Sequence, residues 1–192
     1  MGFTKCTILF FLGIILCLLF LHVGSATDTI TSSKFIKDPE TITSRNGDFP
    51  LGFFTPQNSS KRYVGIWWKS QSTVVWVANR NRPRNDSSRG FTISEDGNLV
   101  VLNGHKLLIW SSNVSSDGFG SISKLLDYGN LVLMESTTGS NVWESLQHPS
   151  NALLPNLKLR TNKVRGEKVK LTSWKSPSDP STGSFSLSVE RL

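Results

Sequence analysis

Short apolar runs separated by turn residues organise most of the chain. Past the first 26 residues, runs rich in Val, Leu, Ile, Phe and Trp alternate with Gly, Asn, Asp and Ser, and the clearest lie at 63–68, 74–78, 98–102, 106–110, 130–134 and 141–143. β-branched and aromatic runs of this length, bounded by turn signals, are typical of strands. The pattern predicts an all-β domain, either a barrel, a sandwich or a prism.

Some of these runs repeat. The hexapeptide at 97–102 recurs at 129–134, and each copy precedes a run that ends in tryptophan, at Trp110 and Trp143. Trp76 lies one similar period before Trp110, and 46–54 is interpreted as a diverged copy of the hexapeptide region. Self-similarity at this period is typical of radially repeated units. We expect three units whose tryptophans are buried at a shared axis, with a ligand platform as the alternative role.

The first 26 residues have the features of a secretory signal peptide. A short start with one lysine leads into an apolar run, which ends in small residues at 24–26. This order predicts cleavage after Ala26, with a retained membrane anchor as the alternative. Both cysteines, Cys6 and Cys17, fall in this segment, so the mature chain has no disulfide and no cysteine metal site. We expect a secreted or cell-surface product in which no later segment spans a membrane.

The basic charge is unevenly distributed. The chain carries a net charge of +7, yet residues 27–150 hold 12 basic and 11 acidic side chains while residues 151–192 hold 8 and 3. An excess confined to one tail does not indicate a nucleic-acid surface. We therefore predict a signal peptide at 1–26, one β domain at 27–150, and at 151–192 a connecting segment with the beginning of a second β module. The alternating strand near Phe185 has no obvious partner in the chain.

Three sequons match the secretory prediction. Each is Asn-x-Ser without an intervening proline, and together they predict N-glycosylation at Asn58, Asn85 and Asn113. A basic loop cluster holds Arg80, Arg82, Arg84 and Arg89 and is a minor candidate for anion binding.

The repeated motifs resemble a known family. The stretches 74–80, 96–100, 110–113, 125–133, 142–145 and 171–177 are similar to the bulb-type, mannose-binding lectin domain of plant S-locus glycoproteins and S-domain receptor-like kinases. The resemblance covers the chain from about residue 27 onward. It implies a β-prism of three four-stranded sheets with pseudo-threefold symmetry. Longer relatives add further extracellular modules, a membrane span and a Ser/Thr kinase, and this chain contains no kinase motif.

The family's sugar site is a strand motif, Q-x-D-x-N-x-V-x-Y, whose alternate side chains share one face. The corresponding positions of the second repeat are Ser94, Asp96, Asn98, Val100 and Leu102, so that Gln and Tyr are replaced. In the third repeat only Asn130 and Val132 match, and in the first Asp48 takes the place of Asn. Each lost hydrogen bond weakens binding by ~0.5–1.5 kcal/mol. Weak mannose binding and a purely structural role in turns and strand entry are both open for these residues.

These observations favour an extracellular recognition module without catalysis, metal or cofactor. Expected partners are a protein or peptide, or a mannose-type glycan, and homo- or heterodimers with related receptors are possible. Recognition signalling, as in self-incompatibility or defence, is the role that the resemblance implies. A soluble mannose lectin with a degenerate site is the alternative. An enzyme is disfavoured because His105 and His148 stand in loop-like segments without a nucleophile motif.

Overall fold

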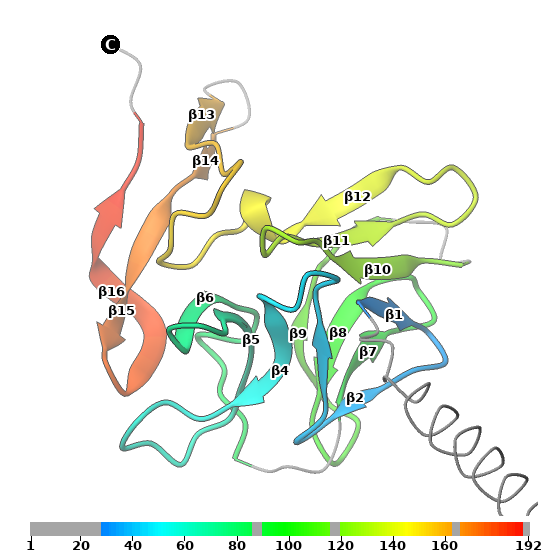
Figure 1. The fold of residues 1–192 in the computed structure, drawn as a ribbon, viewed down its shortest axis with the longest axis horizontal. Coiled ribbons are helices and arrows are strands. Elements are labelled where there is room, and N and C mark those ends of the chain that lie inside the picture. Colours follow the sequence, from blue (N-terminus) through cyan, green and yellow to red (C-terminus); the bar gives the residue numbers. More distant parts are fainter. Residues whose placement is uncertain (1–27, 86–89, 116–119, 163–165, 190–192) are drawn as a thin grey trace, which may run out of the picture.

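The regular secondary structure of the described residues is almost entirely β-strand. The computed structural model describes residues 28–85, 90–115, 120–162 and 166–189, so the predicted signal peptide lies outside the described residues. Within these ranges the strands form three four-stranded and two two-stranded antiparallel sheets, and the one short helical segment is the 3-10 turn Ser145–Gln147 (Figure 1). None of the described helical segments has the length and apolar character needed to cross a bilayer.

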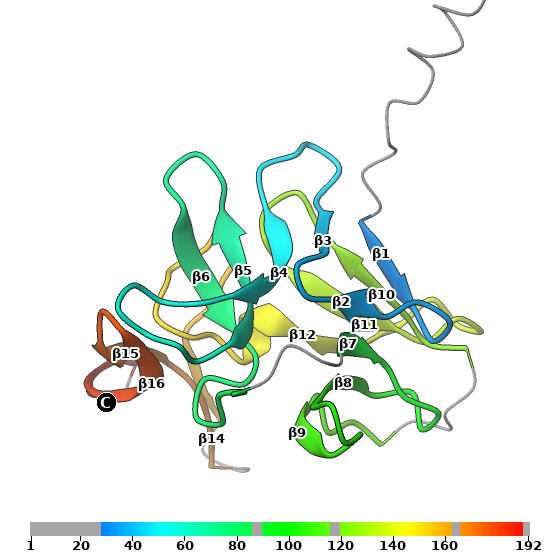
Figure 2. The same cartoon turned by 90° about the horizontal axis from the view of Figure 1, so that it is seen from below.

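The three four-stranded sheets surround a common core (Figures 1 and 2). The first sheet contains, in spatial order, β3 (Thr41–Thr43), β4 (Pro50–Phe54), β5 (Tyr63–Trp68) and β6 (Thr73–Val77). The second contains β2 (Ile36–Lys37), β7 (Gly90–Ile93), β8 (Leu99–Leu102) and β9 (Leu108–Ser111). The third contains β1 (Thr29–Thr31), β10 (Ile122–Leu125), β11 (Leu131–Met134) and β12 (Asn141–Glu144). The predicted β-prism of three four-stranded sheets is confirmed.

The N-terminal segment 29–43 supplies one outer strand to every sheet. β1 pairs with β10 of the third sheet, β2 with β7 of the second and β3 with β4 of the first. The N-terminal segment therefore enters the third sheet first and the first sheet last. Each of these strands places one isoleucine in the core, and Ile30, Ile36 and Ile42 are all at most 2% exposed. The sequence repeat therefore accounts for three strands per sheet, and the fourth comes from outside it.

The tryptophans of the repeat meet at the axis. Trp76, Trp110 and Trp143 stand opposite Ile66, Val101 and Leu133, which are matching places in the three sheets. Every pair of these indole rings has a centroid separation of 5.8 Å and an edge-to-face orientation. Such contacts add to the area that the rings bury. The predicted core role of these residues, and the pseudo-threefold symmetry, are confirmed.

The interpretation of 46–54 as a copy of the hexapeptide region is wrong. Gly47 has a positive φ, as Gly97 and Gly129 do, so the three turns are alike locally. The turn at Gly47, however, leads into β4, the second strand of its sheet, whereas the other two lead into third strands. The third strand of the first sheet is β5, and the strand register places Tyr63, not Asp48, at the position of Asn98. A glycine turn can serve any hairpin, so its sequence does not tell which hairpin it closes.

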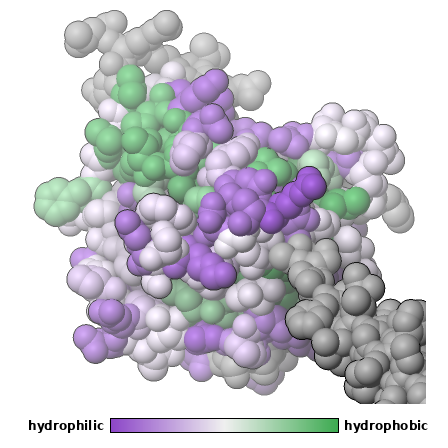
Figure 3. All heavy atoms as spheres, viewed as in Figure 1, coloured by the Kyte–Doolittle hydropathy of each residue, from purple (hydrophilic) through white to green (hydrophobic). Residues whose placement is uncertain are grey.

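The C-terminal part forms two hairpins beside the prism. β13 (Arg160–Asn162) pairs with β14 (Glu167–Val169), and β15 (Leu171–Ser176) pairs with β16 (Asp179–Leu187). The strand near Phe185 thus has a partner, contrary to expectation, because Leu187 pairs with Leu171 across a long, irregular hairpin. Figure 3 shows hydrophobic side chains gathered on this side of the molecule, where Leu153, Phe185, Leu187 and Val189 are exposed. The domain boundary at residue 150 stays a prediction.

Two residues after β6 attach the β15–β16 hairpin to the prism. The Arg80 guanidinium donates hydrogen bonds to the carbonyl oxygens of Pro180 (2.9 Å), Ser173 (2.8 Å) and Thr172 (3.2 Å). The Asn81 side chain accepts from the backbone N–H of Thr182 at 2.9 Å. Burial lowers the pKa of Arg80. Its charge is therefore directed to backbone carbonyls rather than presented to an anion.

Truncating Arg80 is expected to release this hairpin. Arg80→Ala removes three charge-assisted bonds, and we expect the stability of the docked hairpin to fall by about 2–3 kcal/mol. Hydrogen exchange followed by mass spectrometry should show faster exchange in 171–187 and little change in the prism. Arg82→Ala is the matched control because Arg82 is exposed. Equal protection in both variants would contradict the assigned role of Arg80.

Candidate ligand-binding sites

The predicted sugar residues of the second repeat surround a groove on the outer face of the second sheet. This groove has a volume of about 430 Å³, and its lining includes Ser94, Asp96, Val100 and Leu102, with Phe35 from the N-terminal segment. The predicted site residues Ser94, Asp96 and Val100 therefore come together, with Leu102 in the place of the motif's Tyr. Asn98, the central residue of the motif, is not among the residues that line it.

The side chain of Asn98 is directed to the loop that follows β9. Its amide oxygen accepts hydrogen bonds from the Ser112 hydroxyl (2.9 Å) and from the backbone N–H of Val114 (2.7 Å), while its amide nitrogen donates to the Val114 carbonyl (3.2 Å). The residue is only 6% exposed. One amide N–H remains for other partners, so Asn98 acts mainly as a link between two loops of the second sheet.

Asn130 has the matching role in the third sheet. Its amide oxygen accepts from the Ser145 hydroxyl (3.0 Å) and the backbone N–H of Leu146 (3.3 Å), and its amide nitrogen donates to Glu144 (3.1 Å). Val132 lies in the same sheet and is 2% exposed. The two predicted sets thus occupy different sheets and do not form one site. Their use of hydrogen bonds supports the structural alternative named above.

Ser94 and Asp96 hydrogen-bond to each other within the turn before β8. The Ser94 hydroxyl donates to the Asp96 carboxylate, which also accepts from the backbone N–H of Asn98 at 3.2 Å. The serine hydroxyl is the main reason that the pKa of Asp96 is lowered. Part of the polar surface of the groove is therefore already used to hold the turn.

The three sequon asparagines are all exposed. Asn58 and Asn113 have positive φ angles of 56° and 54°, which places them at sharp turns. An exposed turn is accessible to a glycosyltransferase, which agrees with the predicted N-glycosylation. The modification itself remains a prediction.

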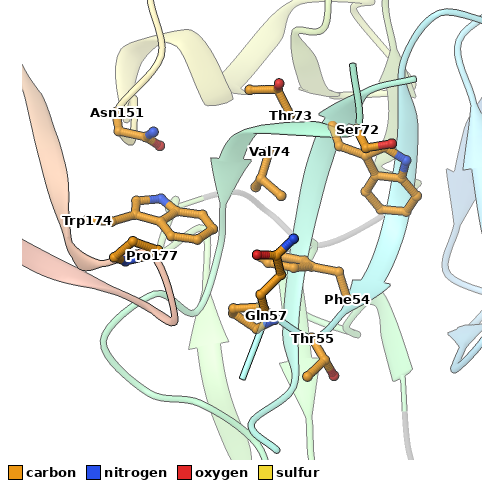
Figure 4. Close-up of a pocket in the computed structure, with 11 residues that line it drawn as sticks. Phe54, Thr55, Gln57, Ser72, Thr73, Val74, Asn151, Trp174 and Pro177 are labelled. Atoms are coloured by element: carbon orange, nitrogen blue, oxygen red, sulfur yellow. The ribbon is translucent and has the colours of Figure 1, made fainter. Parts of the chain in front are cut away.

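A second groove lies at the matching place on the first sheet, and the sequence did not indicate it. It has a volume of about 480 Å³ and is lined by Phe54, Trp67, Val74 and Trp174 among others (Figure 4). The strand register equates Trp67 and Val74 with Leu102 and Leu108 of the second sheet. The sequence signal that could have indicated this groove is the presence of Trp67 and Trp174, two tryptophans that are not part of the repeat.

The ring of His148 packs against the axial tryptophan cluster. Its ring stacks on Trp143 with a centroid separation of 5.5 Å and an angle of 7°, and its carbonyl accepts from the Trp76 indole N–H at 3.0 Å. Partial burial lowers the pKa of His148. His105 is exposed, in the turn between β8 and β9. Among the described residues, no three His, Cys, Asp or Glu side chains are grouped as metal ligands.

This pKa shift predicts a modest loss of stability in mild acid. The unfolded chain binds a proton at His148 before the folded chain does, so the free energy of unfolding should decrease as the pH falls below about 6.5. Urea unfolding at pH 7.5 and pH 5.5 measures the difference. The variant His148→Gln should reduce this difference in the free energy of unfolding, and His105→Gln is the control. An unreduced difference in His148→Gln would contradict the role of His148. The pKa values of Asp28, Asp96 and Asp179 are also lowered, so protonation of these carboxyls decreases the free energy of unfolding only as the pH falls below about 3.8.

Residues 73–175 match the model of the D-mannose binding lectin family. Two G-type lectin S-receptor-like serine/threonine-protein kinases of Arabidopsis thaliana are 45% and 47% identical to the chain, over 92% and 86% of its length. The chain spans 22% and 21% of the length of these relatives.

One solved structure with some similarity is a monomeric mannose-binding lectin from Gastrodia elata. It has 17% sequence identity and a TM-score of 0.49, and the match covers 62% of this chain and 96% of that lectin. The match to the family model extends over more than half of the chain, and the three sheets and their repeated motifs agree with it. The chain therefore belongs to the D-mannose binding lectin family.

Proposed function

We propose that this chain is the extracellular ligand-recognition module of a receptor of the S-receptor-like kinase type. The observation that carries the proposal is the high identity to two such kinases along nearly the whole chain. The predicted signal peptide and three exposed sequons support an extracellular location. The module binds a protein, peptide or glycan and leaves it chemically unchanged, and its biological role is recognition signalling, as in self-incompatibility or defence.

The geometry supports recognition by the outer faces of the prism. Grooves of about 480 Å³ and 430 Å³ lie at matching places on two sheets, and such volumes suit small ligands or short segments of a partner. The prism itself serves as a rigid support, because the tryptophans at its axis and the two asparagine links fix the sheets and loops from within.

Binding of the secreted chain to a glycan array and to a displayed library of extracellular proteins tests this function. We expect saturable binding to a member of one of these collections, with the bound molecule recovered unmodified by mass spectrometry. Conversion of the ligand into a product would overturn the proposal, as would the absence of saturable binding in both collections by a folded chain.

A second candidate function is weak mannose binding in the groove of the second sheet. The convergence of Ser94, Asp96 and Val100 favours it, although Asn98 is largely used elsewhere. Retention on mannose-agarose that is lost in Leu102→Arg but kept in Met134→Arg would support this site. These two residues hold the same place in the second and third sheets, so the pair separates a local effect from a general one.

A further inference from the structure

Five of the eleven residues that line the groove on the first sheet carry rings. Phe54 and Trp67 come from the prism, Trp174 comes from β15, and the other two are Pro56 and Pro177. The rings of Phe54 and Trp174 are stacked, with centroids 6.3 Å apart and planes 23° apart. Figure 4 shows Trp174 and Pro177, from the hairpin, beside Phe54, Gln57 and Thr55 of the first sheet and the loop that follows β4. The wall formed by Trp174 and Pro177 therefore depends on the docking of the β15–β16 hairpin by Arg80 and Asn81.

The polar groups of this groove are uncharged. They come from two amides and three hydroxyls, namely Gln57, Asn151, Thr55, Ser72 and Thr73, and no Asp, Glu, Lys or Arg is among the lining residues. Within the described ranges, neither of these amide side chains holds a hydrogen bond. In the same part of the chain, the Trp174 indole N–H is buried without a partner. The groove therefore suits a neutral ligand, to which the amides of Gln57 and Asn151 can donate and from which they can accept.

We propose that this groove binds an extended, proline-containing segment of a partner protein in the polyproline II conformation. Such a segment makes no hydrogen bonds within itself, so its carbonyls are available to the amide donors of Gln57 and Asn151. Its pyrrolidine rings present apolar surface, which packs against aromatic walls. The segment is also stiff before it binds, so little conformational entropy is lost. The inference rests on the proposed recognition function and gives it a site.

A sugar fits the groove less well. A hexose carries hydroxyl groups around its ring, and each is both a donor and an acceptor that needs a partner when it loses water. The acceptors of the groove are neutral amides and hydroxyls, and the groove has no carboxylate, which would be the stronger acceptor for sugar hydroxyls. Five of its eleven lining residues are aromatic rings or prolines. Pyrrolidine rings pack against such walls without needing hydrogen-bond partners. A sugar is therefore the alternative outcome in the experiment.

The exposed Asn58 lies next to the rim of the groove, directly after Gln57. A glycan on this asparagine would restrict access from that side. The experiment therefore uses the secreted chain in its natural form and as the variant Asn58→Gln.

Fluorescence anisotropy with a labelled decaproline peptide, and with a library of Pro-x-x-Pro peptides, tests the inference. We expect saturable binding that weakens by roughly tenfold or more in Val74→Arg, because a charge then enters a neutral groove. Leu108→Arg is the matched control, since Leu108 holds the same place on the second sheet, and it should leave binding unchanged. Circular dichroism confirms that both variants are folded.

The opposing results are distinct. No saturable binding of any proline-containing peptide by the folded chain or by Asn58→Gln would overturn the inference, as would equal weakening by Val74→Arg and Leu108→Arg. Saturable binding of methyl mannoside that is lost in Val74→Arg, with no binding of any proline-containing peptide, would assign the groove to a sugar and overturn the inference. Failure of this groove, together with binding of another ligand elsewhere on the chain, would leave the proposed recognition function standing.

Discussion

Trp143→Ala is expected to lower the free energy of unfolding by about 3–5 kcal/mol, the usual cost of deleting a buried tryptophan. Trp143 is 5% exposed, and its ring contacts both other tryptophans at the axis as well as His148. Its loss leaves a cavity where all three sheets meet. Because small domains are stable by only about 5–15 kcal/mol, this single change removes a large part of the total. Denaturant unfolding followed by circular dichroism measures it.

Trp68→Ala is the matched control for this prediction. Trp68 is the same residue type at the end of β5, but it is 39% exposed and lies outside the axial cluster. We expect a loss of less than about 1.5 kcal/mol, because little of a cavity forms at the surface. Similar losses in the two variants would mean that the axial cluster is not the centre of stability.

Asn98→Ala is expected to destabilise the fold by about 2–4 kcal/mol, independently of any sugar. The change leaves the Ser112 hydroxyl and the Val114 N–H without their partner in a buried or half-buried place. Thermal and denaturant unfolding of the ligand-free chain measure the loss. Asn130→Ala should behave alike because it holds the same link in the third sheet.

The control for these links is Asn141→Ala. Asn141 is exposed and donates one hydrogen bond, to Glu144, so its loss should change stability by about 0.5 kcal/mol or less. If Asn98→Ala keeps full stability and yet loses a bound ligand, the link assigned to Asn98 is wrong and a direct contact with the ligand is right. Mannose retention of Asn98→Ala is informative only when stability is measured beside it.

The repeat predicted the three units and their shared axis well, whereas the prism itself was implied by the family resemblance. Trp76, Trp110 and Trp143 recur at one period, and large rings with one spacing must occupy matching places, so the axis could be derived. The fourth strand of each sheet could not, because Ile30, Ile36 and Ile42 are isolated isoleucines in strands of two or three residues. Such short strands carry almost no periodic signal.

The candidate site was harder to predict, for a related reason. A strand motif shows which residues share a face, but it does not show whether a side chain turns toward a ligand or toward a neighbouring loop. Asn98 and Asn130 turn toward Ser112 and Ser145, which lie 14 and 15 residues away along the chain. The ring-lined groove joins Phe54 to Trp174, and contact between such distant segments is decided by tertiary packing alone.

The N-terminal segment that threads all three sheets also bears on how the chain is made. β1 is synthesised first among the described strands, yet its partner β10 lies more than 90 residues later, since Thr31 pairs with Ile122. Contacts of such sequence separation form slowly. As the chain is synthesised, the first sheet can form early, whereas β1 stays unpaired until β10 has been made. Loss of residues 29–43 would expose one unpaired edge in each sheet, and open edges favour aggregation.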